Sequence, residues 1–182
     1  AQFKFLTNWN LTLNVIVSFQ LWKIAKGYSK EIADSILNVA VILNFIVVFF
    51  YWRLYFQDPL SVNMNGPNEW FMEYYLHALG PTLMVIDALF IHGSFNTFSK
   101  GLKFLFLLFS SYILWVEFIV APYSSRPQGT VTQGFPYPFL NDLTIYGRTG
   151  FYLSVVFIGC TLYMALFFIK KYALPYMRQA KS

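Results

Sequence analysis

Charged residues are scarce in this chain of 182 residues, at 12% of the total. Soluble domains usually contain about 25%. Hydrophobic residues make up 57% of the chain and aromatic residues 21%. A globule of this size would lack the polar side chains needed to cover its surface, so the composition excludes an ordinary soluble domain. The sequence instead predicts an integral membrane protein whose chemistry lies inside or at the edge of the bilayer.

Several other signals of function are also missing. Cys160 is a lone cysteine, which excludes an internal disulfide. The chain has no Gly-x-Ser-x-Gly elbow, no Walker loop and no Cys-x-x-Cys pair. Its two histidines are far apart and its acids scattered, so neither a metal site nor a cofactor is expected. The net charge of +5 comes from basic residues between apolar runs, without the stripe that nucleic acid requires.

What the sequence does contain is a series of long apolar runs. A membrane-spanning helix needs about 20 mostly apolar residues. Five stretches meet this requirement, at residues 5–22, 33–56, 69–92, 101–121 and 149–170. They are apolar nearly all round, as expected of helices in lipid. The sequence therefore predicts an all-α polytopic transmembrane bundle of five spans in a single domain, with a long lumenal loop at 122–148.

Basic residues predict the orientation of these spans, because cytoplasmic segments carry an excess of Lys and Arg. The loops after the first and third spans lie on the same side as the C-terminus. This side has nine of the 13 basic residues: Lys23, Lys26, Lys30, Lys100, Lys103, Lys170, Lys171, Arg178 and Lys181. We therefore expect a cytoplasmic C-terminus and a lumenal N-terminal segment. One further helix upstream would account for a lumenal start.

The first span is unusually polar. Thr7, Asn10 and Asn14 stand at i, i+3 and i+7, which places them on one helix face. Two interpretations are open. Asn and Thr commonly form hydrogen bonds between membrane helices, and the same three side chains are also suited to a polar site.

The third span has ionisable residues at membrane depth, where they are costly and usually face a cavity or a partner. Glu73 and His77 stand at i and i+4, so the carboxylate can orient the imidazole. Pro81 cannot donate to the carbonyl of His77, which predicts a kink and a freed carbonyl. Such a bend suits a cavity wall, although a histidine there can equally be a structural hydrogen bonder.

Two more acids lie within the predicted spans. Asp87 is about 15 Å along the helix from His77, too far to touch its ring. Glu117, in the fourth span, has three open roles: pairing with a Lys or Arg, hydrogen bonding while protonated, or lining the cavity.

Depth makes one pairing possible. Thr7 lies in the first turn of its span, and His77 lies about 12 Å into the third span from the same side. Both therefore fit the lumenal leaflet. A Thr hydroxyl beside a His is an arrangement of nucleophile and base.

Short motifs along nearly the whole chain resemble the androgen-induced protein family. Four segments carry the resemblance: Phe3-Lys4-Phe5-Leu6-Thr7 with Asn10-Leu11 and Asn14, Trp70 to His77 with Pro81 and Asp87 downstream, Tyr112-Ile113-Leu114-Trp115-Val116, and Tyr137-Pro138-Phe139-Leu140. The chain differs from the family in having Glu73-Tyr74 where an Asn-His pair is frequent, in a Pro displaced by about one residue, and in a longer loop before Tyr137.

The resemblance implies a multi-spanning hydrolase that cleaves fatty acid esters of hydroxy fatty acids with a Thr nucleophile and a His. By motif position these residues are Thr7 and His77. It also implies six spans, one of them ahead of the Thr motif, and a location in the endoplasmic reticulum or another endomembrane.

The leading hypothesis is thus an intramembrane lipid esterase. Thr7 attacks the ester, His77 takes its proton, Asn10 or Asn14 holds the oxyanion and Glu73 orients His77. The alternative is a non-catalytic lipid-binding or scaffolding subunit of a larger membrane complex. A channel or carrier would rest on Glu73, Asp87 and Glu117, whose spread over two helices forms no ring or continuous relay. In each case the expected partners are membrane lipids.

Overall fold

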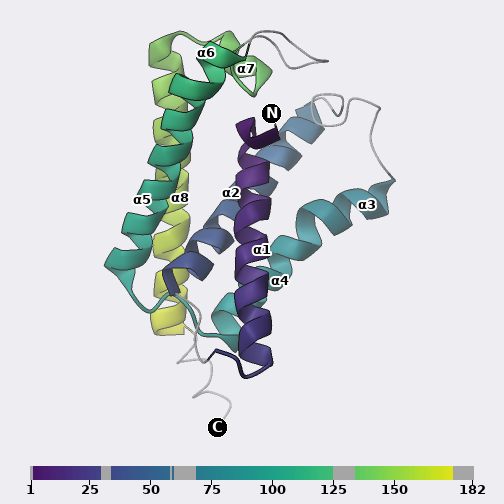
Figure 1. The fold of residues 1–182 in the computed structure, drawn as a ribbon, viewed down its shortest axis with the longest axis vertical. Helices are drawn as coiled ribbons and strands as arrows, with labels where there is room; N and C mark the ends of the chain where they lie inside the picture. Colours follow the sequence, from purple (N-terminus) through teal and green to yellow (C-terminus); the bar gives the residue numbers. More distant parts are fainter. Residues whose placement is uncertain (1, 30–33, 58, 60–68, 125–133, 174–182) are drawn as a thin grey trace.

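The computed structural model describes residues 2–29, 34–57, 59, 69–124 and 134–173 (Figure 1). These residues are helical or lie in short connections, and no β-strand occurs among them. The helices are α1 (Leu6–Ala25), α2 (Asp34–Gln57), α3 (Trp70–Tyr74), α4 (Gly80–Ile86), α5 (Phe98–Leu114), α6 (Ala121–Tyr123), α7 (Pro138–Asn141) and α8 (Ile145–Phe168). The predicted all-α transmembrane class is confirmed.

Four π-helical segments continue or join these helices. They are η3 (Tyr75–Leu79), η4 (Asp87–Ile91), η5 (Trp115–Val120) and η6 (Ile169–Ala173), and a 3₁₀ turn, η1 (Gln2–Lys4), precedes α1. The long helical stretches therefore run from Trp70 to Ile91, from Phe98 to Tyr123 and from Ile145 to Ala173.

These three stretches and α2 are long and apolar enough to cross a membrane, and α1, with 20 residues, is a more polar fifth helix. Three of these five helical stretches are longer than the apolar runs that the sequence predicts for them. In particular, α8 begins at Ile145, inside the expected loop 122–148, and α7 occupies part of what remains.

Successive long helices run in opposite directions, so the bundle has two distinct ends (Figure 1). One end, here called the N-terminal end, contains the start of α1 together with α6 and α7. The other, here called the Lys-rich end, carries six described lysines: Lys23, Lys26, Lys100, Lys103, Lys170 and Lys171.

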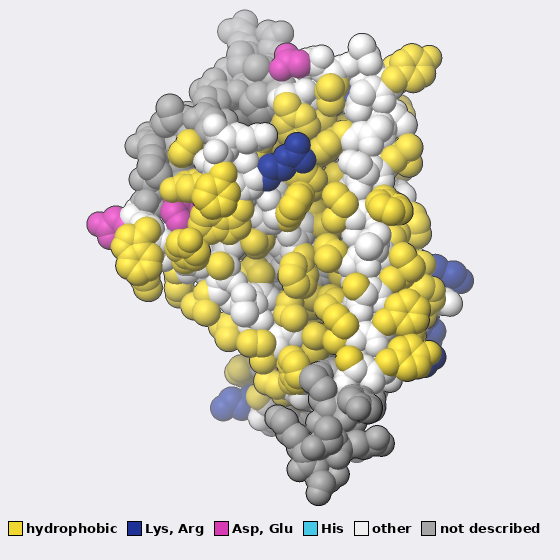
Figure 2. Space-filling model, turned by 180° about the vertical axis from the view of Figure 1, so that it is seen from behind, with side chains coloured by type: hydrophobic (Ala, Val, Ile, Leu, Met, Phe, Trp, Pro, Cys, Tyr) yellow, Lys and Arg dark blue, Asp and Glu magenta, His cyan; other side chains and the backbone are white. Residues whose placement is uncertain are grey.

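Helix α2 is the centre of the bundle and packs against α1, α4, α5 and α8. An almost continuous run from Leu37 to Ile46 is buried, because neighbours cover this part of α2 on all sides. Half of the most apolar window of α2 is buried, against 12% for the stretch Trp70–Ile91. On the face shown in Figure 2, hydrophobic side chains cover most of the described surface and charged ones are few, which suits a surface in contact with lipid.

The Lys-rich end is closed by a polar network around Asp34. Its carboxylate accepts hydrogen bonds from the backbone N–H groups of Asn96 and Thr97, at 3.1 and 3.3 Å, and from the Thr97 hydroxyl at 3.2 Å. The adjoining Asn38 accepts from the N–H of Phe95, which is buried in a left-handed conformation with φ of 64°. Such a conformation is strained for a non-glycine residue and persists only where its surroundings hold it.

Helix α8 joins the same network. The Tyr163 hydroxyl donates to the carbonyl of Thr97 at 3.2 Å, and Lys170 donates to the carbonyl of Gly93 and to the side chain of Asn96. Gly101 lets Tyr163 approach, because a Cβ at that position would overlap the tyrosine ring and its hydroxyl. The start of α2, the turn before α5 and the end of α8 are thus bonded together.

Candidate functional site

The asparagines of α1 bond to α2. Asn10 Nδ2 and Asn14 Nδ2 donate to Asn44 Oδ1 at 2.8 and 2.9 Å, and Asn44 Nδ2 donates to Asn14 Oδ1 at 2.9 Å. Asn44 Nδ2 also lies 3.0 Å from Met84 Sδ on α4. This trio of amides fixes the depth of α1 against α2, in line with the interpretation as hydrogen bonds between helices. Asn10 Oδ1 is buried without a hydrogen-bond partner among the described residues.

Thr7 lies in the first turn of α1, at the N-terminal end, and is exposed. Within the described part of the chain, its hydroxyl makes no hydrogen bond. It is therefore free to contact a lipid or water.

The backbone just ahead of Thr7 is held by aromatic residues from distant segments. The N–H of Leu6 donates to the Tyr137 hydroxyl at 3.2 Å. The Tyr112 hydroxyl donates to the carbonyl of Lys4 at 3.0 Å, and Trp115 Nε1 donates to the carbonyl of Phe3 at 3.1 Å. Tyr112, Trp115 and Tyr137 are here called the aromatic collar. The N-cap residue of α1, Phe5, supplies no side-chain cap. The Tyr137 hydroxyl instead accepts from the N–H of Leu6, one of the unpaired N–H groups in the first turn of α1.

The aromatic collar brings together three of the family-like motifs, which are Phe3–Thr7, Tyr112–Val116 and Tyr137–Leu140. Its members come from Tyr112–Val116 and Tyr137–Leu140, which are far apart in the chain, and they meet at the first motif. The sequence alone indicates no role for either tyrosine. Burial raises the pKa of the Tyr137 phenol, so the group stays neutral in the collar.

His77 lies in η3, half-buried against α2. Its ring stacks on that of Tyr51, with centroids 3.4 Å apart and planes inclined by 12°. The Tyr51 hydroxyl donates to Glu73, whose side chain is 1% exposed. Trp52 Nε1 donates to the carbonyl of His77 at 3.2 Å, the carbonyl that Pro81 was predicted to free. The sequence suggested the pair Glu73 and His77, but nothing in it identified Tyr51 and Trp52 as its partners.

Thr7 and His77 lie at similar depth but are not joined. Asn10 and Asn14 both bond Asn44, and Tyr51 lies seven residues beyond Asn44 on α2, about 10 Å towards the N-terminal end. Thr7 precedes those asparagines by three and seven residues, which is about 5 to 10 Å in the same direction. None of the hydrogen bonds among the described residues links Thr7 to His77.

Asp87 and Glu117 each bond to a basic side chain. Asp87 Oδ2 lies 3.0 Å from His92 Nδ1. Glu117 Oε1 accepts from Arg148 Nε at 3.1 Å and from the Tyr152 hydroxyl at 2.8 Å, so of its three open roles the structure shows pairing with Arg. His77, Asp87 and Glu117 each lie in a π-helical segment, and such segments often mark functional sites.

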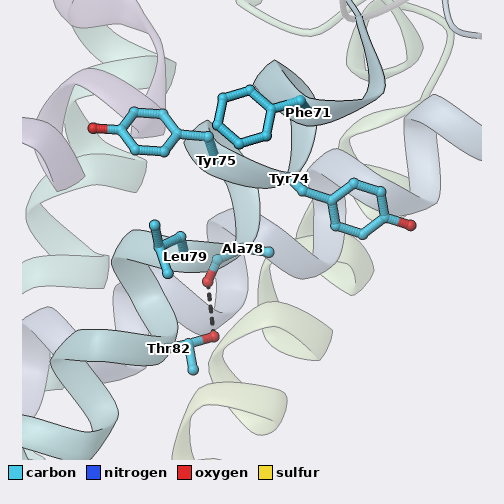
Figure 3. A pocket seen from close by; sticks show the side chains of 6 residues that line it. All are labelled: Phe71, Tyr74, Tyr75, Ala78, Leu79 and Thr82. Carbon is cyan, nitrogen blue, oxygen red and sulfur yellow. Dashed lines mark hydrogen bonds between the residues drawn. The ribbon is translucent and has the colours of Figure 1, made fainter.

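A groove of about 360 Å³ runs along the helical stretch Trp70–Ile91. It is lined by Phe71, Tyr74, Tyr75, Ala78, Leu79 and Thr82 (Figure 3). The Thr82 hydroxyl is bonded to the carbonyl of Ala78 at 2.8 Å. The hydroxyls of Tyr74 and Tyr75 point away from the groove. Its walls are apolar and hold no acid or base, so it suits hydrocarbon and not proton transfer. Among the described residues, no group of three or more His, Cys, Asp and Glu is placed to hold a metal ion.

Taken together, the helices define a class. A chain with four to five apolar helices of spanning length and with polar side chains bonded between them is a polytopic membrane protein. The profile of the FAR-17a/AIG1-like proteins matches residues 1–171, so the chain belongs to this family, the androgen-induced protein family. Comparisons with curated proteins and with solved structures gave no match.

Proposed function

We propose that this protein hydrolyses esters of membrane lipids, of the kind formed between a fatty acid and a hydroxy fatty acid, with Thr7 as nucleophile and His77 as base. The observation that supports the proposal is the shared depth of Thr7 and His77 at the N-terminal end. There, side-chain hydrogen bonds from neighbouring segments hold the backbone of Leu6, next to Thr7, and that of His77. Family membership supports the same pair by motif position.

The reaction proceeds in two halves. The Thr7 oxygen attacks the ester carbonyl while His77 takes the hydroxyl proton. The tetrahedral intermediate then collapses, and His77 returns the proton to the departing alkoxide, which leaves an acyl-threonine. Water attacks this ester while His77 takes one of its protons; the bond to the Thr7 oxygen then breaks, His77 returns the proton to that oxygen, and the fatty acid is released. Glu73 stabilises the imidazolium that forms in each half.

The substrate ester must lie between the two residues. Catalytic hydrogen bonds are often long or poorly aligned before substrate binds, and Thr7 is exposed, so a lipid ester can reach its hydroxyl. The amide nitrogens of Asn10 and Asn14 each carry a second N–H beyond the one that bonds Asn44, and we assign the oxyanion to one of these.

Turnover of a fatty acid ester of a hydroxy fatty acid by the purified chain in lipid nanodiscs tests the proposal. We expect Thr7→Ala and His77→Ala to reduce kcat by at least about 100-fold, because a general base alone contributes roughly that factor. Thr7→Ser should retain activity, since it keeps a hydroxyl. Thr12→Ala is the matched control: its exposed hydroxyl, on the same helix, bonds only the carbonyl of Asn8. Wild-type turnover in either alanine variant would exclude the assigned residue.

The second candidate is a non-catalytic lipid-binding subunit. It is favoured by the lack of a hydrogen bond between Thr7 and His77 and by the exposure of the stretch Trp70–Ile91. It predicts that the wild-type chain binds the same lipid without turning it over, and that Thr7→Ala leaves binding unchanged.

We further propose that the protein resides in the endoplasmic reticulum or another endomembrane with the Lys-rich end in the cytoplasm. The distribution of lysines supports this orientation. An Asn-Gly-Thr acceptor inserted after Tyr123 should be glycosylated in microsomes, and the same acceptor added after Ser182 should not. The reverse pattern would invert the orientation.

A further inference from the structure

Tyr51 and Trp52, adjacent residues on α2, contact the His77 region at three points: its ring, its carbonyl and the neighbouring Glu73. We propose that Tyr51 and Trp52 are positioning residues that hold the His77 imidazole in its reactive orientation. This inference rests on the proposed hydrolase function, to which it adds two residues that touch neither substrate nor nucleophile.

The ring contact restricts how the imidazole turns. With a centroid distance of 3.4 Å and an angle of 12°, the phenol ring lies flat against the imidazole face. Rotation of His77 about its last side-chain bond would drive the ring edge into Tyr51. The same aromatic face attracts the imidazolium once His77 has taken a proton. Tyr51 thus favours one orientation and also the charged intermediate.

The Tyr51 hydroxyl reaches a second member of the site. Glu73 is almost fully buried, and a buried carboxylate is costly unless it is hydrogen-bonded. The donor from Tyr51 stabilises it one helical turn from His77. Removing the hydroxyl alone should therefore have a smaller effect than removing the whole ring.

Trp52 fixes the main chain at the same point. A proline four residues later cannot donate to the carbonyl of His77, and the indole N–H of Trp52 occupies that acceptor at 3.2 Å. The π-helical segment η3 is thereby bonded to α2 at the residue that carries the base. Backbone, ring and neighbouring carboxylate all depend on one turn of α2.

Paired measurements on the full chain in nanodiscs test the inference. The first is the split of turnover into kcat and KM, and the second is the rate at which diethyl pyrocarbonate modifies His77, followed by peptide mass spectrometry. The variants are Tyr51→Leu, Tyr51→Phe and Trp52→Phe. Tyr55→Phe is the matched control, since it removes a hydroxyl one turn further along α2 that has no hydrogen bond among the described residues.

We expect Tyr51→Leu to lower kcat on the order of 100-fold, because misplacing a general base forfeits most of its contribution. Tyr51→Phe and Trp52→Phe should lower kcat roughly tenfold, each losing one of the contacts, with KM within about twofold of wild type. Modification of His77 should be several-fold faster in Tyr51→Leu, because its ring face is uncovered. Tyr55→Phe should match wild type in both measurements.

Wild-type kcat in Tyr51→Leu, or in both Tyr51→Phe and Trp52→Phe should the leucine variant not fold, would overturn the inference. A rise in KM alone would assign these residues to substrate binding and overturn it as well. A wild-type chain without turnover would instead overturn the proposed function. An unchanged modification rate of His77 in the variants would then show separately that α2 does not hold the ring.

Discussion

The two ends of this bundle treat their polar groups differently. At the Lys-rich end, Asp34, Asn38 and Tyr163 are all bonded to the turn before α5, and Lys170 bonds the same turn. At the N-terminal end, α3 diverges from α1 (Figure 1), and the Thr7 hydroxyl has no hydrogen bond within the described residues. The Lys-rich end uses these groups for packing, whereas the proposed function assigns the Thr7 hydroxyl at the other end to the substrate.

This difference suggests a division of labour. Segments that move or bind ligands are usually the less stable parts of a protein, while a well-bonded region maintains the fold. Helix α2 connects the two ends. Its first half, buried from Leu37 to Ile46, lies next to the Asp34 network, and Tyr51 in its second half stacks on His77. Variants at the Lys-rich end should therefore reduce stability first, and variants at the N-terminal end should reduce turnover first.

The largest effect on stability is expected from Asp34→Ala. The substitution leaves the N–H groups of Asn96 and Thr97 and the Thr97 hydroxyl without their acceptor. Hydrogen bonds to a charged group contribute about 1.5–3 kcal/mol, so we expect a loss of about 3 kcal/mol in the free energy of unfolding. The check is unfolding by sodium dodecyl sulfate, followed by tryptophan fluorescence.

Asp142→Ala serves as the control for this variant, because Asp142 is exposed at the N-terminal end and accepts no hydrogen bond among the described residues. At a temperature where the Asp34→Ala protein is still folded, the kcat of Asp34→Ala should match that of wild type. A stable Asp34→Ala protein with impaired kcat would contradict the division between the two ends.

Much of the fold could be predicted from the sequence, because apolar run length alone sets which segments are helices in lipid. The helix ends were less predictable. Helix α8 begins at Ile145, ahead of its apolar run, because Thr144 caps it and Arg148 is bonded to Glu117 within the bundle. A hydropathy profile assigns a charged residue such as Arg148 to a loop, because it does not include the Glu117 partner on another helix.

The candidate site was predictable only in part. Spacing along one helix brought out the face of Thr7, Asn10 and Asn14, and the pair Glu73 and His77, since these relations are local. The contacts of His77 with Tyr51 and Trp52, and the bond from Leu6 to Tyr137, join residues far apart in the chain. Tyrosine and tryptophan are abundant here, so composition gave no means of choosing these three from the rest.

A smaller effect on stability, but a larger one on turnover, is expected from Tyr137→Phe. The variant keeps the edge-on contact with Phe5 and loses the oxygen that accepts from the N–H of Leu6. One neutral hydrogen bond contributes about 1 kcal/mol, so the unfolding free energy should fall by about that amount. Because Thr7 follows Leu6 directly, its oxygen should shift, and small misplacements of a reacting group cost rate steeply. We expect kcat to fall on the order of tenfold.

Tyr146→Phe is the control, since Tyr146 lies at the same end and is 87% exposed. Unfolding by detergent and turnover in nanodiscs, measured on the same preparations, separate the two effects. If Tyr137→Phe loses several kcal/mol while the remaining folded protein keeps wild-type kcat, the aromatic collar supports the fold and not Thr7. The N-terminal end would then be a second packing region like the Lys-rich end, and the contrast between them would not hold.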